Sequence, residues 1–588
     1  MKLSILVICM VFSTCLFAQD EKVVIEENAS LILSGDIKFV LDDISVNNEG
    51  DLNSAEGEII FSSTSTTRSF ITTNGLNLNS LKTGDSYVDL RAEGTFDVTD
   101  LTIGNTDHIT FSDTSSLTLS GEVDAVGALT MESGAALWIK ASITETAMDN
   151  VNIERIGPHN NSIGKYSIYG SPVESASFDV LGTEAQSWIF QYDEGAYTFT
   201  TPVESILTPG KGYFVAFPGD ADGLITFSGT PNYKNLSFSI TRTDNGSSDE
   251  EEGFNLISNP FTGPLDFDSF ISDSGNESVL EESTIWLWDD FSSDTNEGSP
   301  DDYLAINYLG TSSYDITDSR NGGSANWDGT INSSQGFFVK AASSGNISFK
   351  QPMKTLDGNN DESFFRVESI AKYWLSISDN DDKAGSGTLV GFVSDASYER
   401  DRLYDATRFG SGFSIYSLLE DKKLAIQGLP LEWLNTSHDY NIPLGYNIEE
   451  QGDYKIALSA KENNELRALY LIDHLNAKSI NLLEEDYTFF SLAGSVNDRF
   501  SLSHSPFDNS PVLGKENTLL NVKVYGQPNT IVVDAMFDGF YQVYTTGGKL
   551  VLSDFFSPGK TNIPANGGIY IVSVESEEGL SSYKVKVD

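Results

Sequence analysis

Residues 30–37 read SLILSGDI, and residues 116–123 read SLTLSGEV. Both stretches alternate apolar and polar residues and then reach a glycine and an acidic residue, which is typical of a short strand closed by a tight turn. A shorter echo, LTMESG, follows at residues 129–134. Such repeats favour the stacked coils of a β-solenoid over about residues 25–145. A β-sandwich with accidental internal similarity is the alternative.

The period-two alternation continues along the chain, as in YIVSV at residues 570–574, and few windows have a helical period. We therefore predict an all-β protein. It contains an N-terminal β-solenoid-like repeat region, two duplicated β-modules, a β-sandwich and a small C-terminal β-sandwich. The expected boundaries, in that order after a signal peptide at 1–18, are 19–149, 150–240, 252–355, 362–505 and 516–588.

The first eighteen residues have the organisation of a secretory signal peptide. Lys2 is followed by an apolar run over residues 3–17, and Ala18 is the small residue expected before a cleavage site. The run is too short for a membrane anchor, and no other segment reaches spanning length, so we expect no transmembrane segment in the mature chain. The two cysteines, Cys9 and Cys15, both lie in this leader, so the mature protein would have no disulfides and no thiol chemistry.

The composition is strongly acidic. The formal net charge is −51, with 86 Asp and Glu against 35 Lys and Arg. Such a field repels nucleic acids and anionic membrane surfaces. We therefore expect no nucleic-acid partner.

The middle of the chain contains a duplication. Three segments recur in the same order, followed by a shorter match of ITF at 225–227 with ISF at 347–349. Three ordered matches predict two homologous β-modules, separated by a polar, acidic linker at 244–253. The matching pairs are YSIYGSPV (166–173) with FNLISNPF (254–261), FQYD (190–193) with WLWD (286–289), and GYFVA (212–216) with GFFVK (336–340).

Residues 362–505 resemble the β-sandwich that precedes the sorting domain in many secreted proteins of Bacteroidetes, and the two modules resemble units often found upstream of it. The segments that carry the resemblance are LAIQGLP (424–430), IPLG (442–445), GDY (452–454), YLID (470–473) and DRF (498–500).

The last stretch, 516–588, resembles a type A sorting domain of the type IX secretion system. The matching segments are VYTTGGKL (543–550), GIYIV (568–572) and YKVKV (583–587). The resemblance implies that the outer-membrane translocon is a partner, and that the protein is secreted or displayed on the cell surface after passing through the periplasm. The motif residues are Gly547, Gly548, Lys549, Gly568, Ile569, Tyr570 and Lys584.

The sequence contains no catalytic motif: there is no Gly-x-Ser-x-Gly elbow, His-Glu-x-x-His or phosphate-binding loop, and the five histidines are scattered. We predict that the protein is not an enzyme and has no cofactor. Calcium is the one metal that the acidic loops suggest, because hard cations prefer several oxygens on a loop. The candidate ligands are Asp294, Asn296, Asp301, Asp379 and Asp381. Their spacing does not fit a calcium-binding hand, so solvated loops are the preferred interpretation.

Two aromatic pairs, Trp286 with Trp288 and Phe190 with Tyr192, occupy the same place in the two modules. Alternate residues of a strand share a face, so each pair stands side by side and either packs in a core or stacks on a sugar. We favour the core.

Two functional hypotheses follow. The first is a non-enzymatic surface or secreted protein with an adhesive, structural or binding role, whose ligand is a glycan or another surface molecule. The second is a polysaccharide-binding or polysaccharide-degrading protein. The repeat region carries few basic residues, which argues against a lyase for acidic sugars: Lys38, Arg68, Lys82, Arg91 and Lys140. A groove lined by carboxylates and aromatic rings would favour the second hypothesis.

Overall fold

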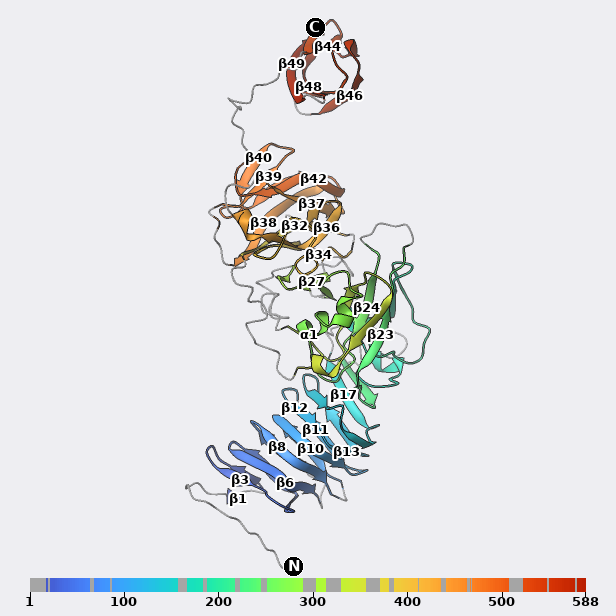
Figure 1. Cartoon of the computed structure of the whole chain (residues 1–588), viewed down its shortest axis with the longest axis vertical. Helices are drawn as coiled ribbons and strands as arrows, with labels where there is room; N and C mark the ends of the chain where they lie inside the picture. Colours follow the sequence, from blue (N-terminus) through green and yellow to red (C-terminus); the bar gives the residue numbers. More distant parts are fainter. Residues whose placement is uncertain are drawn as a thin grey trace, which may run out of the picture. The chain divides into compact units, whose positions relative to one another are not determined.

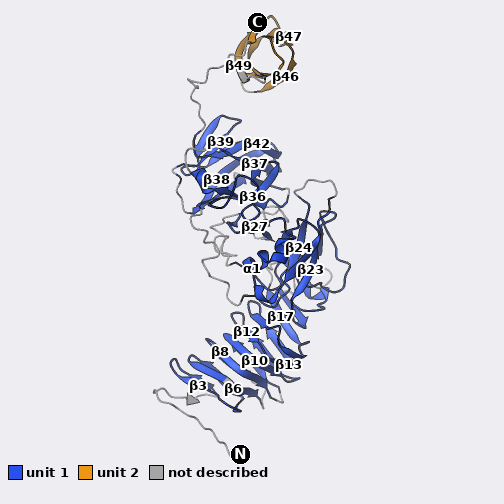
Figure 2. Cartoon of the chain, viewed as in Figure 1, with its two compact units in different colours: residues 1–507 blue, residues 508–588 orange. Residues whose placement is uncertain are grey.

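The computed structural model forms two compact units, residues 1–507 and 508–588 (Figure 2). Among the described residues, no helix has the length and apolar character that crossing a membrane requires. The described residues are 17–18, 22–63, 68–84, 87–156, 166–182, 188–216, 223–244, 251–288, 303–312, 329–355, 371–379, 385–410, 412–434, 440–462, 466, 468–506, 522–546, 549–576 and 579–587.

The N-terminal region is a β-solenoid whose strands stack in two parallel sheets (Figure 1). Phe96 pairs with Leu76 in one neighbouring strand and with Leu117 in the other, so one coil takes 20 or 21 residues. Apolar residues of every coil point into one continuous core, as a solenoid requires. The first sheet contains β2 (Lys22–Ile25), β5 (Ser45–Asn48), β7 (Ser69–Thr73), β9 (Asp89–Glu93), β11 (His108–Phe111), β14 (Ala128–Met131) and β17 (Val151–Ile156), with β1 (Phe17–Ala18) antiparallel at its edge.

The second solenoid sheet contains both copies of the repeat that predicts this fold. The copy at 30–37 begins with β3, and the copy at 116–123 forms β12 and starts β13. The echo at 129–134 begins in β14, so it belongs to the first sheet and is not equivalent to them. The strands of the second sheet are β3 (Ser30–Ile32), β4 (Lys38–Asp42), β6 (Asp51–Ser62), β8 (Leu76–Thr83), β10 (Thr95–Ile103), β12 (Ser116–Leu119), β13 (Glu122–Ala125), β15 (Ala136–Ile139) and β16 (Thr144–Ala147).

The two modules have the same strand order. In the first, the sheet runs β18-β21-β19-β20, and β22 pairs with β17 of the solenoid; in the second, the order is β24-β30-β26-β27, and β31 pairs with β23. The first-module strands are β18 (Tyr166–Tyr169), β19 (Trp188–Asp193), β20 (Thr198–Thr200), β21 (Tyr213–Ala216) and β22 (Leu224–Gly229). Those of the second are β23 (Leu236–Ile240), β24 (Phe254–Ser258), β26 (Ile285–Trp288), β27 (Tyr303–Asn307), β28 (Gly310–Thr311), β30 (Gly336–Lys340) and β31 (Gly345–Phe349).

The register of the two modules also agrees. Phe214 of β21 lies opposite Ile168 and Phe190, and its counterpart Phe338 of β30 lies opposite Leu256 and Trp286. One strand further along the sheet, Tyr192 of β19 lies opposite Phe199 of β20, and its counterpart Trp288 of β26 lies opposite Tyr303 of β27. Tyr192 and Trp288 therefore hold equivalent ladder positions, as do Phe214 and Phe338, which is what the sequence duplication predicts.

The boundary between the modules differs from the predicted one. Strand β23 lies in the segment assigned to the first module, 150–240, but it pairs with β31 of the second. The polar stretch at 244–253 is therefore internal to the second module, and Glu194 holds both of its ends. Its carboxylate accepts hydrogen bonds from the backbone N–H of Thr243 at 2.8 Å and of Gly253 at 3.1 Å.

The second module carries the longer insertion, and part of it is helical. Two short helices follow β25 (Leu265–Asp266), which pairs with β29 (Thr330–Ile331): α1 (Phe267–Ile271) and α2 (Ser274–Glu277). Asp266 and Asp273 cap their N-termini, each by accepting a backbone N–H. The first module has a single 3₁₀ turn at the corresponding place, η1 (Phe178–Leu181), and η4 (Gln351–Met353) follows the second module.

Residues 371–506 form one continuous sheet that folds over on itself, in the order β40-β39-β42-β37-β35-β36-β33-β32-β38-β41 (Figure 1). Its two arms meet in one core, where Tyr446 of β37 packs on Phe489 of the terminal strand β41 at 5.4 Å. This gives the predicted sandwich its two layers. The strands are β32 (Ala371–Asp379), β33 (Gly385–Val393), β34 (Ala406–Thr407), β35 (Ser414–Leu419), β36 (Lys422–Pro430), β37 (Ile442–Ile448), β38 (Gly452–Glu462), β39 (Tyr470–Asp473), β40 (Lys478–Asn481), β41 (Tyr487–Ser491) and β42 (Gly494–Ser503), with η5 (Leu431–Leu434).

A buried ion pair joins two of the segments that carry the family resemblance of the sandwich. Arg499 donates to Asp473 at 3.1 Å, and both side chains are almost fully buried. Tyr487 donates to the same carboxylate at 2.8 Å, and the guanidinium lies over the ring of Phe489. Burial alone would raise the pKa of Asp473, but the hydrogen bonds from Arg499 and Tyr487 hold it below its ordinary value.

The C-terminal unit is a small antiparallel sandwich. One layer is β43-β44-β47 and the other is β46-β45-β48-β49, with valines such as Val533, Val543 and Val572 between them. The strands are β43 (Val522–Gln527), β44 (Thr530–Ala535), β45 (Gly539–Thr545), β46 (Leu550–Phe556), β47 (Gly559–Pro564), β48 (Gly568–Ser576) and β49 (Gly579–Val587).

Candidate functional site

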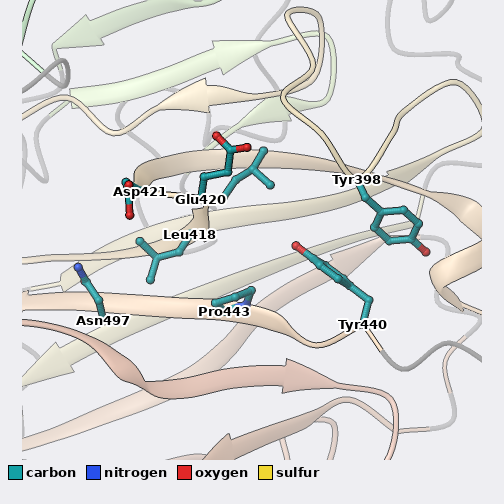
Figure 3. Close-up of a pocket in the computed structure, with 8 residues that line it drawn as sticks. Tyr398, Leu418, Glu420, Asp421, Tyr440, Pro443 and Asn497 are labelled. Atoms are coloured by element: carbon teal, nitrogen blue, oxygen red, sulfur yellow. The ribbon is translucent and has the colours of Figure 1, made fainter. Parts of the chain in front are cut away.

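A cavity of about 490 Å³ opens in the folded sheet of residues 371–506 (Figure 3). It combines two tyrosine rings, two carboxylates and an amide with a small apolar surface. The lining residues are Tyr398, Leu418, Leu419, Glu420, Asp421, Tyr440, Pro443 and Asn497.

The carboxylates come from the tight turn between β35 and β36. Leu419 pairs with Lys422, so Glu420 and Asp421 form a two-residue hairpin loop. Glu420 has a φ of 55°, in the left-handed region that disfavours every residue with a Cβ. Tight hairpins normally place Gly, Asn or Asp in such positions. The backbone is therefore strained at Glu420, and strain of this kind is concentrated at functional sites.

The tyrosines form the opposite wall. Tyr398 and Tyr440 lie with ring centroids 5.0 Å apart at an angle of 57°. The carbonyl of Tyr440 accepts a hydrogen bond from the indole of the buried Trp433, which fixes the backbone at this wall. Burial raises the pKa of both tyrosines, so their hydroxyls stay protonated at neutral pH.

Asn497 on β42 completes the polar rim. Its Oδ1 accepts a hydrogen bond from the Tyr416 hydroxyl at 2.9 Å. This approach requires glycine at position 445, because a Cβ there would lie 2.3 Å from the Tyr416 ring and 2.6 Å from Asn497 Oδ1. Gly445 belongs to the IPLG segment of the family resemblance, so that segment shapes the rim of the pocket.

This arrangement can recognise a polyhydroxylated ring. Aromatic side chains offer flat apolar surface, while carboxylates and amides bond hydroxyl groups. Hydroxyl-to-carboxylate hydrogen bonds are short and strong because the acceptor is ionised. The two carboxylates also repel anionic ligands, which disfavours phosphorylated or acidic sugars in this pocket.

Of the five predicted calcium ligands, the described structure contains Asp379. Asp294, Asn296, Asp301 and Asp381 lie outside the described residues. Asp379 ends β32, opposite Tyr454 of β38. In the described part of the chain, no three His, Cys, Asp or Glu side chains are grouped so as to hold a metal ion.

The aromatic pairs of the two modules belong to one buried cluster. Trp286 is fully buried and donates its indole N–H to the carbonyl of Thr407, and Trp288 donates to the carbonyl of Tyr166. Phe190 and Tyr192 are partly buried members of the same cluster. These four residues pack as core, the interpretation that the sequence favours.

Four of the basic residues of the solenoid are paired with acids. Lys38 and Lys82 both pair with Glu58, Arg68 pairs with Asp89, and Arg91 pairs with Glu132. Side chains neutralised in this way do not form a clamp for an acidic sugar.

The sorting-motif residues that the structure describes lie on one sheet, β46-β45-β48-β49. Gly568 and Ile569 begin β48, and Lys584 of β49 pairs with Ile571. Tyr570 packs against the core and donates its hydroxyl to the carbonyl of Asn566 at 3.0 Å, a tyrosine corner that fixes the entry to the strand.

The remaining motif residues belong to the hairpin between β45 and β46. The carbonyl of Lys549 accepts from the N–H of Thr545 and closes this hairpin, while Gly547 and Gly548 lie outside the described residues.

Sequence reasoning missed the pocket. Glu420-Asp421 is not one of the dipeptides typical of a two-residue hairpin loop, so the turn itself carries only a weak signal. Nothing in the sequence indicates that Tyr398, Tyr440 and Asn497 converge on it, because they lie up to 77 positions from that turn.

No curated protein matches the chain. One family model does match, over residues 80–504, and its description is a domain of unknown function (DUF8693). The match covers the later solenoid coils, both modules and the folded sheet with its pocket, and it ends one residue after β42. It stops before the C-terminal unit, which begins at residue 508. Because the match spans well over half of the sequence, the chain belongs to the DUF8693 family.

Proposed function

We propose that this protein is an exported, non-enzymatic binding protein that acts outside the cytoplasm and holds a neutral or amino-bearing carbohydrate in the tyrosine-lined pocket. The observation that carries the proposal is the convergence of Tyr398 and Tyr440 with Glu420, Asp421 and Asn497 on one cavity. It meets the condition under which the sequence favours polysaccharide binding, a groove lined by carboxylates and aromatic rings. Its size also suits one or two sugar rings.

Binding, rather than hydrolysis, is what the site supports. Glu420 and Asp421 are adjacent in one turn and both are solvent-exposed. A glycosidase needs two carboxyl groups on opposite sides of the scissile bond, one of them with a raised pKa. Neighbouring carboxylates on one rim can accept hydrogen bonds from several hydroxyls of the same sugar.

The first experiment is a glycan array with the mature protein, followed by calorimetry on the sugars that bind. Replacing Tyr398 by Ala or Asp421 by Asn is expected to weaken binding about tenfold, the effect of losing one stacking surface or one charge-assisted hydrogen bond. Asp453→Asn is the matched control, because Asp453 is an exposed acid on β38 away from the pocket. Equal binding by all three variants, or no glycan bound at all, would refute the proposal.

Export is the second part of the proposal. The leader at 1–18 would direct the chain to the periplasm, and the C-terminal unit would direct it onward through the type IX secretion system. This is supported by the resemblance of 516–588 to a sorting domain, by the separate folding unit at 508–588, and by the end of the family match before it.

Deleting residues 516–588 is expected to leave the protein in the periplasm. Fusing those residues and part of the preceding linker to a reporter with a signal peptide is expected to send the reporter to the cell surface or the medium. Cell fractionation and surface labelling measure both. Normal surface amounts of the truncated protein would show that the C-terminal unit is an ordinary domain.

A further inference from the structure

The two modules pack against each other through the same residues of each, as the subunits of a symmetric dimer do. Phe214 of the first module contacts Trp288 of the second at 4.9 Å, and the equivalent contact, Phe338 with Tyr192, measures 5.2 Å. Exchanging the two modules turns one contact into the other, because Phe214 corresponds to Phe338 and Trp288 corresponds to Tyr192. The modules are therefore related by a local two-fold axis.

Backbone contacts repeat the same symmetry. Tyr169 forms a bridge with Gln335, and the counterparts of these residues, Ile257 and Lys211, form the reciprocal bridge. A surface used by one module consequently has a defined counterpart on the other.

One of the two counterpart surfaces is occupied. Phe409, from the loop between β34 and β35, inserts its ring into the aromatic face of the second module. It stacks on Phe254 at 4.0 Å and lies 4.5 Å from Tyr303 and 4.7 Å from Phe338. Phe254 and Phe338 are fully buried as a result.

The counterpart surface on the first module is the aromatic face of β18, β19 and β20. Tyr166, Phe199 and Phe214 hold the positions of Phe254, Tyr303 and Phe338. Phe199 packs on Phe214 at 4.9 Å, as Tyr303 packs on Phe338 at 5.6 Å. The ring arrangement that receives Phe409 is thus present twice.

The first-module face is exposed at its outer part. Phe199 is 40% exposed and its counterpart Tyr303 is partly buried, whereas Phe214 in the middle of the face is buried, as Phe338 is. Trp188, at the position of the buried Thr284, is 51% exposed. Both side chains are on the same sheet face, because Trp188 alternates with Phe190 and Tyr192 along β19. Two large aromatic side chains left in solvent on one sheet face mark an interaction surface.

We propose that this face, centred on Trp188 and Phe199, is a docking site for a phenylalanine or tyrosine side chain on an extended segment of another protein. The occupied twin identifies the chemistry of the occupant: a ring projected from an extended loop and stacked among aromatic side chains. The preceding residue in that loop is Arg408. A basic residue beside the ring would suit a partner of this acidic protein, because opposite charge speeds encounter.

The test uses the mature full-length protein and a synthetic peptide of residues 405–412, DATRFGSG, which contains one aromatic residue. Saturation-transfer NMR is expected to show contact at the phenyl protons, with a Kd of about 0.1–1 mM for a single-ring anchor. A peptide with Phe409→Ala is expected to lose the signal.

Variants distinguish this face from any other site. Trp188→Ala and Phe199→Ala are expected to weaken binding at least about fivefold, since exposed aromatic anchors dominate such contacts. Phe70→Ala is the matched control, because Phe70 is a 43% exposed phenylalanine on a solenoid strand. Thermal melts and circular dichroism show that each variant is folded.

Three results would overturn the proposal. The first is no saturable signal from the peptide. The second is unchanged binding in both the Trp188 and the Phe199 variants. The third is Trp188-dependent binding of an oligosaccharide without binding of the peptide, which would make the face a sugar-stacking platform. Loss of glycan binding in the pocket variants would leave this test unaffected, because the pocket lies on other strands.

Discussion

Replacing Glu420 separates the stability of the pocket turn from its function. A residue with a Cβ costs about 1–2 kcal/mol in the left-handed region, and Glu420 has a φ of 55°. Glycine removes this cost but adds about 0.5–1 kcal/mol of backbone entropy to the unfolded state. The free energy of unfolding of Glu420→Gly is therefore expected to equal that of the parent or to exceed it by up to about 1 kcal/mol.

Glu420→Ala is the matched comparison, because alanine keeps the Cβ and the strain while removing the carboxylate. The glycine variant is therefore expected to be as stable as the alanine variant or up to about 1 kcal/mol more stable. Urea titrations followed by tryptophan fluorescence measure the difference as a shift in midpoint. Both variants lose the same carboxylate, so both are expected to bind the glycan about five- to tenfold more weakly.

The two readouts refute different steps. If the glycine variant is less stable than the alanine variant, the turn is not strained. If the glycine variant is stable and binds the glycan as the parent does, Glu420 is not a ligand-binding residue.

Three further outcomes are expected. Arg499→Met leaves Asp473 buried without its counter-ion, so the free energy of unfolding measured by urea denaturation should fall by about 3–5 kcal/mol. Adding Asp473→Asn should restore part of this loss. An unchanged free energy of unfolding in Arg499→Met would contradict the importance of the pair. Burial lowers the pKa of Lys354 to about 7. The folded state therefore loses stability as pH falls from the ordinary lysine value through 7, so Lys354→Met should raise the melting temperature at pH 6 more than at pH 10; a pH-independent effect would contradict this. If the acidic loops are merely solvated, calcium and chelator should give the same melting temperature, and a large rise with calcium would show a site.

Features set by local pattern could be predicted from the sequence. The two-residue period identified strands, and the ordered matches identified the duplication before any strand was paired. The repeat at 30–37 and 116–123 predicted the solenoid, and the structure places both copies in the same sheet.

Features set by long-range pairing could not be predicted. Strand β23 follows the first module in the chain, yet its partner β31 is more than 100 residues away. The helices α1 and α2 are too short for a helical period, and only their Asp caps signal them. Asp473 and Arg499 stood in two motif segments, but only the fold shows that they form an ion pair. The pocket depends on residues from four separate segments.

The reciprocal contacts give the two modules the geometry of a homodimer within one chain. An interface in which each side presents the same residues is what two identical subunits form. Because one polypeptide carries both copies, their association does not depend on protein concentration, as that of separate subunits does. The two copies also need not be identical: the second contains the insertion with α1 and α2, while the first has the shorter form.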